Sequence, residues 1–212
     1  MLSMLRQNKI LMTVKTIFTL ADAAHAAAVE KGFYKEPRSL ARTVGLVTTE
    51  IGEIMEAARK GRYFDAEKYD KGGPFIIQAF EDVVKDTVQD EIADSIIRLL
   101  DLIGSCGSLN PSSFQLLEAD KMRSFRFDVL ARPDCFNENY DDWESLHLDC
   151  LVLTATIARH NIGETRFMVH CVASIRLLLR LAEKMGVGDI DFHIQEKMKY
   201  NRTRPYMHGK KF

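Results

Sequence analysis

A buried helix is predicted by the sequence Glu91-Ile92-Ala93-Asp94-Ser95-Ile96-Ile97-Arg98-Leu99-Leu100-Asp101-Leu102-Ile103. Its charged residues follow one narrow stripe, made by Glu91, Asp94, Arg98 and Asp101, and apolar residues cover most of the remaining circumference. A helix that is apolar nearly all round is expected to be buried. The stripe would then carry carboxylates into the interior, where such groups usually pair with cations or coordinate metals.

A second acidic pattern precedes this helix at Glu50-Ile51-Gly52-Glu53, with Glu56 one turn further on. Residues three apart share one face of a helix, and here that face borders an apolar stripe containing Val47 and Ile54. Four carboxylates from two helices can converge on Mg²⁺, which takes oxygen ligands and is usually held beside substrate phosphates. The alternative is a solvated helix surface, which is the more common role of Glu pairs at this spacing.

The composition excludes several classes of protein. The chain has 212 residues with a formal net charge of -1, so no global positive field points to a nucleic acid polymer. No apolar run reaches about 18 residues, so no membrane span is expected. The four cysteines form no C-x-x-C pair, which indicates reduced thiols and a cytoplasmic location.

Helical periodicity and turn residues predict an all-α bundle, with no segment of strand period. We expect one all-α domain over residues 1–212, made of an acidic metal-binding half (1–107) and a second half (140–212). A loop is predicted at 131–140. The predicted helices cover residues 4–31, 39–60 with Ser39 as the cap, 75–103 with a break near Asp86, 112–130, 141–160, 164–185 and 190–202.

The two halves show a hint of an internal repeat. Ser95–Leu102 resembles Ser174–Leu181, and extending this register places His170 opposite Glu91 and Ala173 opposite Asp94. The preceding helix, 146–160, has no E-x-x-E pattern either. If a duplication occurred, the second half kept its helices and lost its acids. A chance similarity between two Leu-rich helices is the alternative.

Three groups of residues resemble the MazG-like branch of the all-α nucleoside triphosphate pyrophosphohydrolases. The family pattern E-x-x-E followed by E-x-x-D is matched by Glu50, Glu53, Glu91 and Asp94. Ala28–Tyr34, followed by Glu36-Pro37-Arg38, resembles the end of the family's first helix. Lys197-Met198-Lys199-Tyr200-Asn201-Arg202-Thr203-Arg204-Pro205 resembles its K-x-x-x-N-x-x-R-P signature.

The chain departs from this family pattern in two places. Residues 62–85 look like an insertion, and residues 105–189 separate the acidic helix from the Lys-Asn-Arg signature. Family members usually dimerise and build each site from both subunits. The resemblance and the repeat together suggest a fused tandem, or pseudo-dimer, with a degenerate second half that carries the signature.

The resemblance implies Mg²⁺-dependent hydrolysis of a (d)NTP to (d)NMP and pyrophosphate, with Mn²⁺ as an alternative ion. Glu50, Glu53, Glu91 and Asp94 would be the metal ligands, and Glu50, Glu53 or Glu56 would act as the base. The residues that would bind substrate are Lys197, Tyr200, Asn201 and Arg204.

Two alternative functions stay open at this point. One is an enzyme similar to phosphoribosyl-ATP pyrophosphohydrolase, and the other is a non-catalytic helical protein that binds a nucleotide or a partner. The expected partner is a nucleoside triphosphate, with no nucleic acid polymer and no membrane. A homodimer and a monomer are both open.

Overall fold

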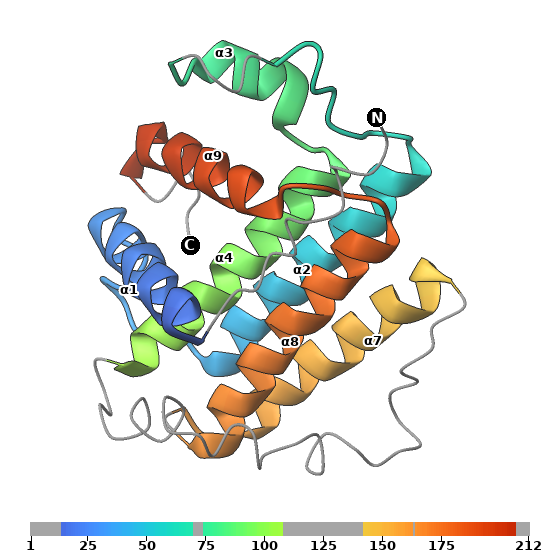
Figure 1. Cartoon of the computed structure of the whole chain (residues 1–212). Helices are drawn as coiled ribbons and strands as arrows, with labels where there is room; N and C mark the ends of the chain where they lie inside the picture. Colours follow the sequence, from blue (N-terminus) through green and yellow to red (C-terminus); the bar gives the residue numbers. More distant parts are fainter. Residues whose placement is uncertain (1–13, 70–73, 108–141, 163, 207–212) are drawn as a thin grey trace.

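The computed structural model describes residues 14–69, 74–107, 142–162 and 164–206 (Figure 1). These residues form helices and loops and contain no strand, so the all-α prediction is confirmed. The elements are α1 (Val14–Glu30), α2 (Leu40–Arg59), the short α3 (Ile77–Ala79), a π-helical turn η1 (Phe80–Val84), α4 (Val88–Gly107), α7 (Trp143–Thr156), a 3₁₀ turn η2 (Ile157–Arg159), α8 (Thr165–Lys184) and α9 (Ile190–Thr203).

The predicted helix ends correspond to local backbone signals. Ser39 caps α2 by accepting a hydrogen bond from the backbone N–H of Arg42 at 3.2 Å. The expected break near Asp86 is confirmed, because this residue has a φ of 59° between η1 and α4. The predictions for 112–130 and 131–140 lie outside the described residues.

Gly32 ends α1 for two separate reasons. Its φ of 80° lies in the left-handed region, which favours glycine. In addition, a Cβ at this position would lie 2.1 Å from the ring of Tyr206, which packs directly on the glycine. The chain after α9 is thereby held against the end of α1.

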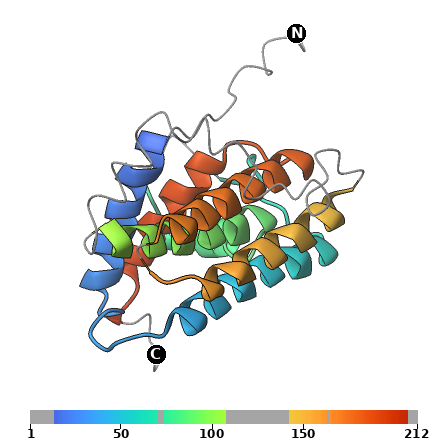
Figure 2. The same cartoon turned by 90° about the horizontal axis from the view of Figure 1, so that it is seen from below.

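Four helices form a closed bundle with α4 as its most enclosed member. α2 packs on α4, α4 on α8, α8 on α7, and α7 on α2. Figure 2 shows α2 and α7 side by side along the lower face. α1 and α9 pack on α4 from outside the bundle (Figure 1).

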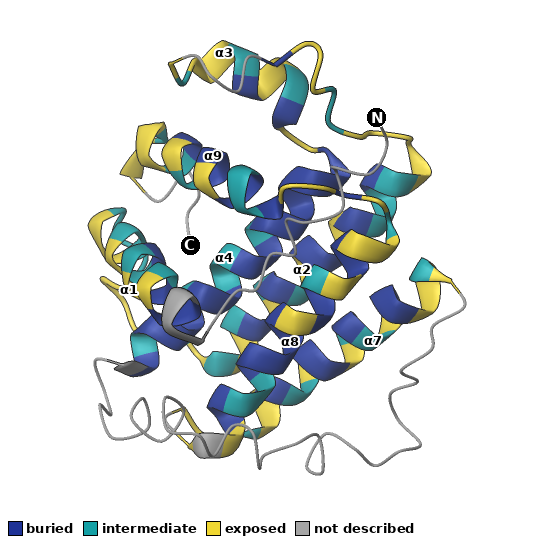
Figure 3. Cartoon of the chain, in the orientation of Figure 1, coloured by how far each residue is buried: buried dark blue, intermediate teal, exposed yellow. Residues whose placement is uncertain are grey.

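The burial of α4 follows from this central position. It contacts α1, α2, α8 and α9, and it is buried along most of its length (Figure 3). Its fully buried side chains include Ile92, Ile96, Leu99, Leu100 and Ile103. The burial predicted from its apolar circumference is confirmed. One continuous hydrophobic core receives side chains from α1, α2, α4, α7, α8 and α9.

A smaller core joins the segment between α2 and α4 to α9. Phe80 stacks on Tyr200 with ring centroids 4.4 Å apart, and the Tyr200 hydroxyl donates a hydrogen bond to Glu81 at 2.9 Å. The Tyr69 hydroxyl donates a hydrogen bond to Glu196, which lies on α9 like Tyr200. The segment predicted as an insertion, 62–85, therefore fixes α9 in place.

The helices of the described residues are short or carry many polar side chains. None of the helices there combines the length and the apolar character needed to cross a bilayer.

Candidate functional site

Three glutamates form a cluster where α2 packs on α4. Each of Glu50, Glu53 and Glu91 offers a carboxylate oxygen, and these oxygens lie within 4.8 Å of one another. Glu50 and Glu91 are buried and Glu53 is exposed. The i, i+3 spacing on α2 places its two carboxylates on the face that meets α4. Carboxylate oxygens are the ligands that Mg²⁺ and Mn²⁺ prefer, so this donor set fits a hard divalent cation.

The cluster carries more negative charge than its surroundings neutralise. Burial, together with the Asp94 carboxylate, raises the pKa of Glu50 to about 7 despite the nearby Arg98. Burial and the adjacent Asp90 raise the pKa of Glu91 to about 9. Without a bound cation, Glu91 therefore favours the protonated form near neutral pH, and Glu50 is close to half protonated. A divalent cation would supply the missing positive charge.

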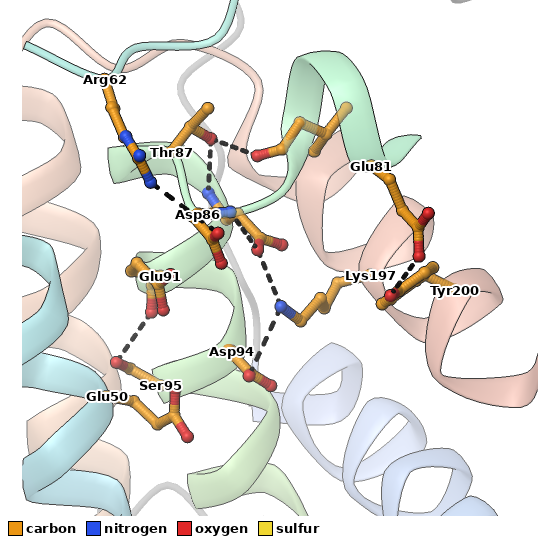
Figure 4. Close-up of polar contacts among 12 residues, drawn as sticks. Glu50, Arg62, Glu81, Asp86, Thr87, Glu91, Asp94, Ser95, Lys197 and Tyr200 are labelled. Carbon is orange, nitrogen blue, oxygen red and sulfur yellow. Dashed lines mark hydrogen bonds and ion pairs between the residues drawn. The ribbon is translucent and has the colours of Figure 1, made fainter. Parts of the chain in front are cut away.

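Asp94, predicted as the fourth ligand, lies in a different environment. Its Oδ2 is 3.5 Å from Nζ of Lys197, which also lies 2.8 Å from Oδ2 of Asp90. In Figure 4, Asp94 points toward Lys197. Burial acts to raise the pKa of Asp94, but Lys197 and Arg98 hold it below its ordinary value. Asp94 is therefore an ionised partner of Lys197 beside the cluster of three glutamates.

Arg98 connects the glutamate cluster to the next part of the site. Its Nη2 lies 2.5 Å from Oε1 of Glu50 on α2. The carboxylates of Asp94 and Glu50 raise the pKa of Arg98 against the opposing effect of burial. Arg98 therefore pairs with Glu50 on the neighbouring helix α2 and also interacts with Asp94 on α4.

The structure does not bring Glu56 to the cluster. Its carboxylate pairs with Arg59 at 2.6 Å and Lys60 at 2.8 Å on the outside of α2. Three residues along an α-helix fall about 60° short of a full turn. Glu56, two such steps after Glu50, therefore points about 120° away from the face that Glu50 occupies. Glu56 therefore lies outside the group of three glutamates, and its role as the base stays a prediction of the resemblance.

A cavity of about 110 Å³ adjoins the cluster through Asp94 and Arg98, which line it. Its walls come from α1, α2, α4 and α9 and from the segment after α1. The lining is rich in cations and also contains the ring of Phe33. The cationic side chains are Lys31, Arg38, Arg98, Arg202 and Arg204. Three carboxylates, Glu30, Asp94 and Asp101, also line the cavity, so the five cations exceed the anions by two. This excess and the Phe33 ring suit an anionic ligand with a planar group.

The four residues predicted to bind substrate divide into two groups. Asn201 and Arg204 line the cavity. Lys197 is instead buried against Asp90 and Asp94, and Tyr200 is committed to the small core with Phe80. The resemblance gave no individual roles to Lys31 and Arg38, although both lie within the Ala28–Arg38 stretch that it included.

Lys31 holds the end of α9 beside the cavity. Its ammonium donates hydrogen bonds to the backbone carbonyl oxygens of Arg202 at 2.7 Å and Arg204 at 2.8 Å. Carbonyls in the last turn of a helix lack intrahelical partners and attract cations. Lys31 therefore ties α1 to the segment that carries Asn201 and Arg204.

Comparisons of the chain with protein families, curated proteins and solved structures found no match. The fold and the site geometry define an all-α protein with a carboxylate cluster next to a cationic cavity.

Proposed function

We propose that this chain is a Mg²⁺-dependent nucleoside triphosphate pyrophosphohydrolase of MazG-like architecture. The observation that carries the proposal is the glutamate cluster, Glu50, Glu53 and Glu91, adjoining a cavity lined by five cationic side chains. A triphosphate is a polyanion whose hydrolysis depends on charge neutralisation and alignment of a water molecule. This arrangement supplies groups for both requirements within one site.

Glu50, Glu53 and Glu91 would hold the ion, and Mn²⁺ would fit the same oxygen donors. When bound, Mg²⁺ supplies a positive charge that neutralises phosphate oxygens. Arg98 already contacts Glu50 and lines the cavity, so it is placed to bind phosphate oxygens beside the cluster. Arg204 adds a guanidinium from the α9 side, and such groups can bind phosphate through two parallel hydrogen bonds.

Glu53 is the carboxylate we assign to the attacking water. It is exposed, whereas Glu50 and Glu91 are buried, so water can reach it directly. It accepts the proton as the water oxygen forms a bond to the α-phosphorus. The bond from that phosphorus to the bridging oxygen breaks, and pyrophosphate leaves with the bonding electron pair. Nucleoside monophosphate is the second product.

The second half of the chain fits a degenerate copy fused to the first. The repeat segments lie in α4 and α8, which pack on each other, and the preceding helices α2 and α7 also pack on each other. A two-fold related pair of helical hairpins would make these same contacts. Superposition of α2–α4 on α7–α8 tests this part of the proposal, and the absence of a common fit would remove it.

The reaction is tested by incubating the protein with ribo- and deoxyribonucleoside triphosphates in Mg²⁺ and, separately, in EDTA. We expect Mg²⁺-dependent appearance of monophosphate and pyrophosphate, and loss of both with Glu91→Gln. Formation of diphosphate and orthophosphate would contradict the proposed cleavage position. Nucleotide binding without turnover would favour a non-catalytic binding protein, and turnover of phosphoribosyl-ATP alone would favour that narrower enzyme class.

A further inference from the structure

Asp101 lines the cavity and lies further along α4 from the glutamate cluster than Asp94 does. It follows Asp94 by seven residues on the charged stripe of α4, a rise of about 10 Å along the helix. Both residues line the same cavity. With a triphosphate bound beside the glutamate cluster, a nucleoside directed along α4 would approach Asp101. The environment of Asp101 therefore bears on the identity of the base.

Two donors from outside α4 hold the Asp101 carboxylate. Nδ1 of His25 on α1 lies 2.9 Å from its Oδ1, and the hydroxyl of Tyr34 donates to the same oxygen at 2.9 Å. Burial and the Asp101 charge raise the pKa of Tyr34, so its hydroxyl stays protonated as a donor. The rings of His25 and Tyr34 also meet edge to face, with centroids 4.6 Å apart. The carboxylate is thus oriented by two side chains that also contact each other.

Both described hydrogen bonds reach Oδ1, and among the described residues none is recorded at Oδ2. Asn201 lines the same cavity, and its Oδ1 is buried without a hydrogen-bond partner within the described part of the chain, so Asp101 is the acceptor that a ligand could reach. The neighbouring wall carries Arg38, whose guanidinium lies 4.8 Å from the centre of the Phe33 ring. The wall near Asp101 therefore presents a carboxylate acceptor close to the planar groups of Arg38 and Phe33.

Acceptors of this kind discriminate between bases by their exocyclic groups. A carboxylate can accept a hydrogen bond from the amino group of cytosine, adenine or guanine. Uracil and hypoxanthine carry an oxygen where cytosine and adenine carry that amino group. Two acceptors would then face each other, and neither would be satisfied. The amino-bearing base is favoured on this ground.

We infer that Asp101 is a specificity residue that selects nucleotides with an exocyclic amino group on the base. The inference rests on the proposed function, because it uses the cluster to orient the triphosphate. His25 and Tyr34 are positioning residues for this carboxylate. The substrate class is thereby narrowed from nucleoside triphosphates in general to those of cytosine, adenine or guanine.

The matched test compares kcat/KM of the wild-type protein for dCTP with dUTP, and for dATP with dITP. Within each pair the amino group is replaced by an oxygen. In the pair that contains the preferred substrate, we expect kcat/KM for the nucleotide with the amino group to be about tenfold or more above that for its partner. This ratio is the effect of one hydrogen bond to a charged group. Ratios near one in both pairs, or a preference for the oxygen-bearing members, would overturn the inference.

Asp101→Asn adds an NH₂ donor and removes the charge with little change of shape. We expect the amino preference to fall by about tenfold or more while turnover of dUTP or dITP persists. Asp22→Asn is the matched control, because Asp22 is an exposed residue of α1 and does not line the cavity. An unchanged preference in a folded Asp101→Asn protein would contradict the assignment. If that variant does not fold, the wild-type ratios decide.

Loss of the proposed function can be separated from loss of this inference. If no nucleotide yields pyrophosphate, equilibrium binding of dCTP, dUTP, dATP and dITP to the wild-type protein is measured in Mg²⁺. Tighter binding of the amino members would keep the specificity assignment while removing the enzyme. Turnover of all four nucleotides without a preference for the amino group would keep the enzyme and remove the specificity assignment. Equal binding, or no binding, would overturn the assignment.

Discussion

α4 and α8 are two 20-residue helices of one bundle that differ in where their charged side chains lie. α4 carries Asp90, Glu91 and Asp94 into or beside the core. At the positions that match Glu91 and Asp94 in the repeat, α8 has His170 and Ala173, while its Arg176 and Arg180 are exposed. One helix thus buries charges that need partners, and the other keeps its charges in solvent.

The two helices differ in whether their buried residues need charged partners. A core of α8 type needs no counter-ions, whereas the carboxylates of α4 require Lys197, Arg98 and, in our proposal, a metal ion. Buried charges are costly unless they are paired, and replacing them with apolar groups often leaves a protein equally stable. The carboxylates of α4 are therefore better explained by a chemical role than by a contribution to folding.

The largest effect on stability is expected from Lys197→Met. This change leaves Asp90 buried with its cation removed, which should lower the free energy of unfolding by about 3–5 kcal/mol. Chemical denaturation measures the difference. Lys60→Met is the control, because Lys60 makes an exposed ion pair on α2 and such pairs contribute little. Equal effects of the two variants would show that the buried pair has no special role.

The next largest effect is expected when a carboxylate is introduced into α8. Ala173→Asp places an acid at the position that the suggested repeat aligns with Asp94, but Ala173 is buried and no partner equivalent to Lys197 is recorded beside it among the described residues. We expect a loss of about 3 kcal/mol in the free energy of unfolding. Ala155→Asp, at an exposed position of α7, controls for the intrinsic effect of aspartate in a helix. A fully stable Ala173→Asp protein would mean that α8 tolerates charge as α4 does.

A somewhat smaller gain is expected from metal binding. At a Mg²⁺ concentration 100 times its Kd, the free energy of unfolding should rise by about 2.7 kcal/mol, and Glu91→Gln should lose this gain. Glu50 and Glu91 have pKa values of about 7 and about 9 in the folded protein, above their ordinary value of 4.5. Between the ordinary pKa of 4.5 and these raised values, the folded state therefore binds more protons than the unfolded state.

It follows that the stability of the metal-free protein should fall as the pH rises from about 5 to 9. Mg²⁺ must displace those protons, so the stabilisation at a fixed Mg²⁺ concentration should be larger near pH 9 than near pH 6. Thermal unfolding with Mg²⁺ and with EDTA across this range measures both trends. A Mg²⁺ effect that grows toward low pH would contradict the assignment of these glutamates.

The smallest effect compares two serines at matched positions of the repeat. Ser95 donates a hydrogen bond to the carbonyl oxygen of Glu91 at 2.8 Å, whereas the hydroxyl of Ser174 is buried without a recorded partner in the described residues. Ser95→Ala should cost about 1 kcal/mol, and Ser174→Ala should be neutral or stabilising. Urea denaturation of the two variants gives the comparison. The reverse order would mean that the polar group in α8 is the better satisfied one.

Much of the fold follows from local sequence patterns. The apolar circumference of α4 predicts its central place, and Ser39, Gly32 and Asp86 mark helix boundaries that depend on only a few neighbouring residues. The meeting of Glu50, Glu53 and Glu91 follows from i, i+3 spacing once α2 packs on α4. These features are accessible because each rests on helical periodicity.

Contacts between distant residues could not be predicted in the same way. Lys197 pairs with Asp90 across 107 positions, and Tyr200 meets Glu81 across 119. No periodicity relates such residues, so Lys197 and Tyr200 were predicted to bind substrate on resemblance alone. The two donors to Asp101 also come from outside its own helix. Site details depend on these tertiary contacts, whereas helix positions do not.

The most direct test of the central claim is the kcat for Mg²⁺-dependent pyrophosphate release by Glu53→Gln and Glu56→Gln. The two residues lie one turn apart on α2, but only Glu53 belongs to the glutamate cluster. We predict a loss of more than about 100-fold for Glu53→Gln, since losing even an outer partner of a metal site costs about 10–100-fold. Glu56→Gln should stay close to wild type. Equal activities of the two variants would contradict the account.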